Sequence, residues 1–143
     1  MITAVDTNVL IDILTDDPVF REDSLAALRR CLARGTLVAC DIVWAEVVAA
    51  FPDVGAAQTA LRGIPVAYQE VGVVAATRAG VAWRAYRQAK GTRERLVTDF
   101  LVGAHALEQA DRLLTRDRGF HRAAFEGLTI IDPSVTPRVG DVG

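Results

Sequence analysis

The chain has 143 residues, 51% of them hydrophobic and 24% charged, a composition that predicts one compact domain and excludes a largely disordered protein. Its formal net charge of −2 argues against a bulk electrostatic binder of nucleic acid. No apolar stretch approaches the roughly 20 uninterrupted residues of a membrane span, and the amino terminus lacks the basic region of a signal peptide. Cys31 and Cys40 form no CxxC pair. We therefore expect a cytoplasmic protein with reduced core thiols and no membrane contact.

Short apolar runs alternate with helical stretches along the chain, which predicts an α/β fold with a central parallel sheet flanked by helices. Breakers such as Gly35 and Pro52 end the helices, and Asp41 is expected to be a simple N-cap. The first half is predicted to contain a strand over 2–5, helices over 8–14 and 20–34, a strand over 37–40, and helices over 42–51 and 54–61.

The second half continues the alternation and ends in a different kind of segment. Thr98 is expected to cap the second helix of this half. Prolines and glycines without an apolar cluster predict a loosely ordered tail over 133–143, so that the folded domain spans 1–132. The predicted elements are helices over 73–89 and 99–109 and strands over 112–115 and 128–131.

Four acidic residues stand in sequence that otherwise reads as core: Asp6, Glu46, Asp99 and Asp117. An ionised carboxylate in an apolar setting is costly, so four that converge need a cation to neutralise them. Hard oxygen ligands favour Mg²⁺, for which Mn²⁺ can substitute. The acids therefore predict a metal-dependent hydrolase of phosphate esters, and two divalent ions would change the net charge from −2 to +2.

The predicted topology brings these acids to one edge. Ligands of parallel sheets sit beyond the carboxyl ends of the strands, where Asp6, Glu46 and Asp117 are expected. Asp99 lies instead at a helix start, where the helix dipole favours its ionised form. Gly103 shares the helical face of Asp99 and is expected to leave room there for a metal or substrate.

The motifs around the four acids, DTNVLIDIL, WAEV, TDFLVGAHAL and TRDRGF, resemble those of PIN-domain ribonucleases in identity, order and spacing. The resemblance is close to VapC-type toxins and extends from Met1 to about Asp132. It implies a single-domain PIN-like fold and a Mg²⁺-dependent endoribonuclease. It also implies the toxin of a VapBC toxin–antitoxin pair, a homodimer, and inhibition by a VapB-type antitoxin.

The four acids are expected to have two different roles. Asp6, Asp99 and Asp117 would hold one or two ions that polarise the scissile phosphate and activate water. Glu46 is expected either to ligate an ion through water or to position the nucleophile.

Other polar residues near the acids are candidates for substrate binding. These are Asn8, Thr115 and Arg116, although turn or cap roles explain the first two equally well. At least one of the nearby arginines, Arg93, Arg95, Arg116 and Arg118, is expected to contact an RNA phosphate.

Several polar and aromatic residues are expected to be structural. Asp12, Asp16 and Asp17 are predicted to be solvated at a helix end, and His105 to be a satisfied buried histidine. Neither histidine stands in a recognisable acid–base pairing. Trp44 is expected to pack, and apolar residues of the 42–61 helical pair are candidates for a dimer or antitoxin surface.

Three other functions remain open. The chain is also compatible with a PIN nuclease of RNA processing that is not a toxin, or with a catalytically silent PIN-like binding module. A receiver-like signalling domain has a similar sheet, but it needs a second acid beside Asp6 and a lysine near a late strand, where the sole lysine, Lys90, does not lie.

Overall fold

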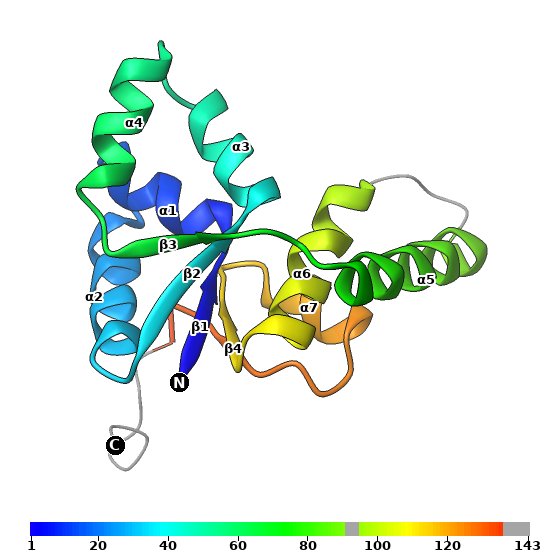
Figure 1. Cartoon of the computed structure of the whole chain (residues 1–143). Helices are drawn as coiled ribbons and strands as arrows, with labels where there is room; N and C mark the ends of the chain where they lie inside the picture. Colours follow the sequence, from blue (N-terminus) through cyan, green and yellow to red (C-terminus); the bar gives the residue numbers. More distant parts are fainter. Residues whose placement is uncertain (91–94, 136–143) are drawn as a thin grey trace.

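The computed structural model describes residues 1–90 and 95–135, and in them five parallel strands form one sheet in the order β3-β2-β1-β4-β5 (Figure 1). This arrangement confirms the predicted α/β fold with a parallel sheet. Arg93 and most of the predicted loose tail, residues 136–143, lie outside the described residues. The strands are β1 (Ile2–Val5), β2 (Thr36–Cys40), β3 (Val66–Gln69), β4 (Arg112–Leu114) and β5 (Ile130–Ile131).

The helices pack around the sheet in two groups. In Figure 1 the first four lie on one side of the molecule, and the last three lie on the other, where α5 and α6 pack along each other. The helices are α1 (Thr7–Leu14), α2 (Arg21–Leu32), α3 (Asp41–Ala49), α4 (Val54–Arg62), α5 (Val73–Lys90), α6 (Val97–Gln109) and α7 (Arg118–Ala124).

The buried hydrophobic residues form two clusters. The larger cluster joins β1, β2 and β4 to α1, α2 and α3 and includes fully buried residues such as Leu10, Leu37 and Leu113. The smaller cluster is centred on Phe100 and Phe125 and joins α5, α6 and the end of α7. Cys31 and Cys40 are free and buried in the larger cluster, as predicted for core thiols.

The sequence missed two elements. β3 lies at the sheet edge with Ala67 and Tyr68 exposed, so it lacks the continuous apolar run of a central strand. The helix α7 has only 7 residues, too few for a clear helical period.

Two predicted caps were wrong. The helix α6 begins at Val97 rather than at Asp99, and its N-cap is Leu96 rather than Thr98. Asp41 is the first residue of α3, not its N-cap. The Asp41 carboxylate still has a structural role, because it accepts hydrogen bonds from the backbone N–H groups of Ile42 (3.2 Å) and Val71 (3.3 Å) and so ties α3 to the segment after β3.

The register of the sheet brings the ends of the central strands together. Val5 of β1 is paired with Leu114 of β4, and the Asp6 backbone N–H donates to the Leu114 carbonyl over 2.9 Å. The residues that follow these two strands therefore start from the same edge of the sheet.

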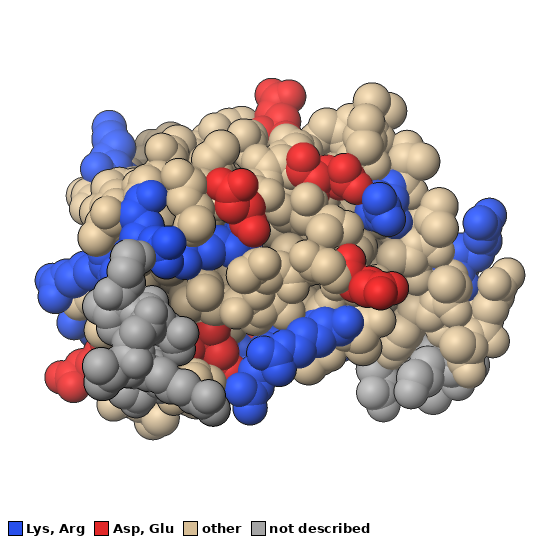
Figure 2. All heavy atoms as spheres, turned by 90° about the horizontal axis from the view of Figure 1, so that it is seen from below, with Lys and Arg blue, Asp and Glu red and all other residues tan. Residues whose placement is uncertain are grey.

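The face seen from below Figure 1, on the side where the chain begins, carries a mixed distribution of charge. Figure 2 shows basic and acidic side chains there, interspersed among uncharged ones. No helix in the described part of the chain combines the length and apolar character needed to cross a membrane.

Candidate functional site

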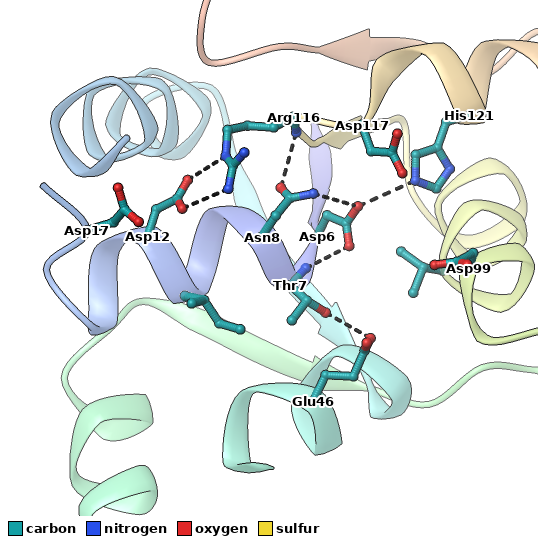
Figure 3. Close-up of a pocket in the computed structure, with 12 residues that line it drawn as sticks. Asp6, Thr7, Asn8, Asp12, Asp17, Glu46, Asp99, Arg116, Asp117 and His121 are labelled. Atoms are coloured by element: carbon teal, nitrogen blue, oxygen red, sulfur yellow. Dashed lines mark hydrogen bonds and ion pairs between the residues drawn. The ribbon is translucent and has the colours of Figure 1, made fainter. Parts of the chain in front are cut away.

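A pocket opens at the carboxyl edge of the sheet, bordered by α1, α3, α6 and the turn after β4 (Figure 3). All four acids predicted from the sequence line it, although they come from four separate stretches of the chain. The lining residues are Asp6, Thr7, Asn8, Ile11, Asp12, Asp17, Glu46, Asp99, Val102, Arg116, Asp117 and His121.

Asp6 follows β1 and is held by several donors. Its Oδ1 accepts from the Thr7 backbone N–H (2.7 Å), and its Oδ2 accepts from the Thr115 hydroxyl (2.8 Å) and the Asn8 amide (3.5 Å). His121 Nε2 lies 3.4 Å from the same Oδ2. Burial by itself would raise the pKa of Asp6, but the hydrogen bond and charge of His121, with the bonds from Thr115 and Thr7, hold this pKa below its usual value.

Glu46 projects from α3 toward Asp6 and Asp99. Its Oε1 accepts a hydrogen bond from the Thr7 hydroxyl over 3.0 Å, which fixes the carboxylate at the pocket wall. The pKa of Glu46 is raised, first by loss of water there and then by the negative charges of Asp6 and Asp99, against the Thr7 bond that lowers it. Loss of water and the neighbouring acids therefore both favour the protonated form of Glu46.

Asp117 lies in the turn after β4 and is paired with an internal cation. Arg95 donates from Nη1 to Asp117 Oδ2 (2.6 Å) and from Nη2 to Oδ1 (3.3 Å). The backbone N–H of Asp117 donates to the Thr115 hydroxyl (2.9 Å). Thr115 therefore links two of the four acids through one hydroxyl group.

The donor chemistry of the pocket fits a divalent metal, since four carboxylates line one cavity and carboxylate oxygens are the ligands that such ions prefer. Within residues 1–90 and 95–135, however, no three His, Cys, Asp or Glu side chains form a group ready to hold an ion. Two of the acids instead face internal partners, Asp6 with His121 and Asp117 with Arg95.

The predicted substrate-binding residues occupy different positions. Thr115 is fully buried beneath the pocket, and its hydroxyl contacts both Asp6 and the backbone of Asp117, which favours the role of orienting these acids over direct contact with the substrate. Asn8 lines the pocket and accepts from the Arg116 backbone N–H over 3.1 Å.

Arg116 also lines the pocket, but its guanidinium is held on the side of α1 and α2. It donates to Asp12 from Nε (2.8 Å) and Nη2 (3.0 Å), and it lies 3.9 Å from the centre of the Phe20 ring. The prediction that Asp12 is solvated was therefore wrong: its exposed fraction is 2%, and Ser24 Oγ also donates to it. Periodicity gave no signal for this pair, because its members are 104 residues apart.

His121 is the site residue that sequence reasoning missed. The expectation that neither histidine stands in a recognisable acid–base pairing was wrong for His121, which is buried with its Nε2 3.4 Å from Asp6 Oδ2. Its position four residues after Asp117, one turn along α7, was the available signal.

Gly103 makes room for His121 rather than for a metal. A Cβ at Gly103 would lie 2.6 Å from Phe125 Cδ2 and 2.9 Å from His121 Nδ1, so the expected free space is filled by these two rings. His105 is buried and bonded to Gln69 Oε1 over 2.7 Å, as a structural histidine should be. Trp44 packs edge-to-face against Tyr68, with ring centroids 5.4 Å apart.

Comparison with known proteins identifies one family. Residues 3–126 match the PIN domain family. No curated protein gives a significant match to the chain.

Solved structures with a similar fold include two complexes and one toxin. VapBC2 from Rickettsia felis, bound to a DNA fragment from its promoter, is 21% identical over 92% of this chain and 98% of that one, with a TM-score of 0.71. VapBC-1 from nontypeable Haemophilus influenzae is 19% identical over 94% and 100%, with a TM-score of 0.71. VapC20 from Mycobacterium tuberculosis, described as a sarcin–ricin loop cleaving toxin, is 16% identical over 89% and 98%, with a TM-score of 0.59. These likenesses show a shared fold.

Proposed function

Because the chain belongs to the PIN-domain family, we propose that it is a metal-dependent endoribonuclease that hydrolyses RNA phosphodiester bonds. The observation that carries the proposal is the convergence of Asp6, Glu46, Asp99 and Asp117 on one pocket. The solved toxin VapC20, similar in fold, is described as cleaving the sarcin–ricin loop. Family membership also excludes the receiver-like alternative.

The four acids would hold the metal, Mg²⁺ with Mn²⁺ as a substitute. When bound, the ion supplies charge neutralisation for the scissile phosphate and a lower pKa for the attacking water. Thr7 and Thr115 hold Asp6 in a fixed orientation through its two carboxylate oxygens. Thr7 holds Glu46 through Oε1, which leaves Oε2 to accept a proton from the attacking water. The raised pKa of Glu46 suits this role of general base.

We further propose that the protein is the homodimeric toxin of a VapBC pair and that a VapB-type antitoxin inhibits it. Support comes from the VapBC complexes whose toxin fold it shares over nearly the whole chain. The helical pair α3–α4 gives limited apolar surface for such contacts: Val54 is 61% exposed, whereas Ala57 and Leu61 are buried. Expression that arrests growth, with rescue by co-expression of a small neighbouring antitoxin gene, would support this role.

The test of the nuclease is cleavage of total RNA by purified protein with Mg²⁺ or Mn²⁺, with a chelator control. Water attack predicts products with a 5′-phosphate and a 3′-hydroxyl. Asp6→Asn should lower the rate at least about 100-fold if Asp6 holds the ion. Asp23→Asn is the matched control, since Asp23 is an exposed acid on α2 that does not line the pocket.

The outcomes separate the alternatives. Cleavage that persists with chelator, or cyclic phosphate ends, contradicts the metal mechanism. Absence of cleavage of any RNA points to a silent binding module, and cleavage without growth arrest points to a processing nuclease.

A further inference from the structure

The Arg95 guanidinium fits the Asp117 carboxylate in a two-pronged contact. Its Nη1 and Nη2 donate to the two different oxygens, Oδ2 at 2.6 Å and Oδ1 at 3.3 Å. Such paired N–H···O bonds are stronger and more directional than a single contact between charges. Among the described residues, Arg95 provides both of the side-chain hydrogen bonds that the Asp117 carboxylate accepts.

An aromatic ring contacts the same guanidinium on its other side. The Arg95 guanidinium carbon lies 4.5 Å from the centre of the Phe120 ring, a distance at which the ring face attracts a cation. Phe120 itself packs edge-to-face on Phe100, with ring centroids 5.0 Å apart. The guanidinium is thus held between an acid and an aromatic ring rather than lying free at the surface.

More than one acid contributes to the negative electrostatic potential at the Arg95 guanidinium. The pKa of Arg95 is raised by its hydrogen bond to Asp117 and by the negative charges of Asp117 and Asp99, against partial burial that lowers it. Arg95 therefore supplies positive charge to the same acids that are proposed to hold the metal.

We infer that Arg95 is the internal counter-ion of Asp117 and that a divalent cation entering the pocket must displace its guanidinium. The inference rests on the proposed function, because it places the metal at the same acids. Each Asp117 oxygen already accepts a hydrogen bond from Arg95, and two cations on one carboxylate repel each other, so an ion is expected to bind Asp117 only once the guanidinium has left it. Arg95 thereby lowers the metal affinity of the site, because only the fraction of molecules with Asp117 released is competent to bind.

The expected effect is moderate. The side chains of Arg95 and Asp117 are 33% and 34% exposed, so solvent screens the pair. Removing the guanidinium should therefore tighten metal binding by about 1.4-fold to fivefold, which corresponds to the range expected for a partly exposed ion pair.

The experiment is a calorimetric titration of the full-length protein with Mn²⁺ alone, without RNA, so that the readout is a dissociation constant rather than cleavage. The variants are Arg95→Gln, which removes the positive charge, and Arg95→Lys, which keeps the charge but cannot donate two parallel hydrogen bonds to the carboxylate. Arg78→Gln is the matched control, because Arg78 pairs with Glu108 over 2.9 Å. Glu108 is nine residues from Asp99 along α6, or about 13 Å.

The inference expects the tightest binding for Arg95→Gln, an intermediate value for Arg95→Lys, and the wild-type value for Arg78→Gln. Equal or weaker binding by both Arg95 variants would overturn the inference and leave the metal site intact. No Mn²⁺ binding by any of the four proteins would overturn both the inference and the metal part of the proposed function. The two Arg95 variants differ in charge, so a folding defect in one leaves the other as a test.

Discussion

At the scale of single residues, the site depends on donors that keep a buried acid ionised. Asp6 is 9% exposed, yet its pKa lies below its usual value because Thr7, Thr115 and His121 contact its two oxygens. A carboxylate whose pKa is lower in the folded than in the unfolded protein stabilises the fold above the unfolded pKa. That stabilisation is lost as the pH falls through the folded value.

We therefore predict that Asp6→Asn lowers the free energy of unfolding at pH 7 by about 1.5–3 kcal/mol, the loss expected for a hydrogen bond to a charged group. The difference in unfolding free energy between Asp6→Asn and wild type should shrink as the pH falls below the usual pKa of 3.8. In that range the wild-type carboxylate becomes protonated and loses the stabilisation that its charge provided. Urea unfolding at stepped pH values from 7 to 3 measures this difference. A difference that does not depend on pH would contradict the account.

Gly103 allows a second prediction at this scale, with Gly80 as a matched control. Ala at position 103 would press on the rings of Phe125 and His121, so Gly103→Ala should destabilise the protein by about 1–3 kcal/mol. Gly80 also lies within a helix, but a Cβ added there would meet nothing within 4 Å, so Gly80→Ala should stabilise by about 0.5–1 kcal/mol. Thermal unfolding of both variants tests the contrast, and equal effects would refute it.

At the scale of elements, α1 is joined to the turn between β4 and α7. The contacts are the Asp12–Arg116 pair and the bond from the Arg116 backbone N–H to Asn8, and both come from residues of α1. The turn carries Asp117, so α1 helps to set the position of an acid more than 100 residues away. The same residues explain why Arg116 is held away from the centre of the pocket.

Replacement of two acids near the end of α1 should separate a buried pair from a solvated one. Asp12→Asn removes a charge that is 2% exposed and leaves Arg116 without its partner, which should cost about 1–3 kcal/mol after allowing for the partial exposure of Arg116. Asp16→Asn should change stability by less than about 0.5 kcal/mol, because Asp16 is 81% exposed in its pair with Arg21. Asn also tolerates the positive φ of 54° at Asp16.

Chemical denaturation of these two variants is the measurement. A loss in Asp16→Asn as large as that in Asp12→Asn would show that burial does not set the energy of these pairs.

At the scale of the whole molecule, the acids form a local concentration of negative charge in a protein whose net charge is only −2. Elsewhere, basic and acidic side chains are interspersed, as on the face in Figure 2. A divalent ion that binds only the folded protein should therefore stabilise the entire domain by mass action.

We predict that Mn²⁺ at about 100 times its dissociation constant adds about 2.7 kcal/mol to the free energy of unfolding. For a domain of this size, that corresponds to a rise in Tm of roughly 5–12 °C. A chelator should reverse the rise, and Asp99→Asn should remove most of it. Differential scanning calorimetry provides the measurement, and an equal rise in wild type and Asp99→Asn would place the ion elsewhere.

Local sequence was sufficient for most of the fold. The central strands β1, β2 and β4 are short buried apolar runs, and the helices around them were predicted within a few residues. The edge strand β3 was not predicted from the sequence, because half of its residues are exposed and its pairing depends on β2. A strand of that kind is defined by its neighbour more than by its own residues.

The sequence by itself determined the α/β architecture and the four acids, because hydrophobic periodicity and motif context are properties of short segments. Tertiary structure alone decided which acids have ion-pair partners: Asp6 with His121 and Asp117 with Arg95 among the four, and Asp12 with Arg116 beside them. Electrostatic interactions depend on the distances between side chains, and these partners are 22 to 115 residues apart along the chain. For that reason the four acids of the pocket could be predicted from the sequence, whereas His121, the buried position of Asp12 and the charge balance of the pocket could not.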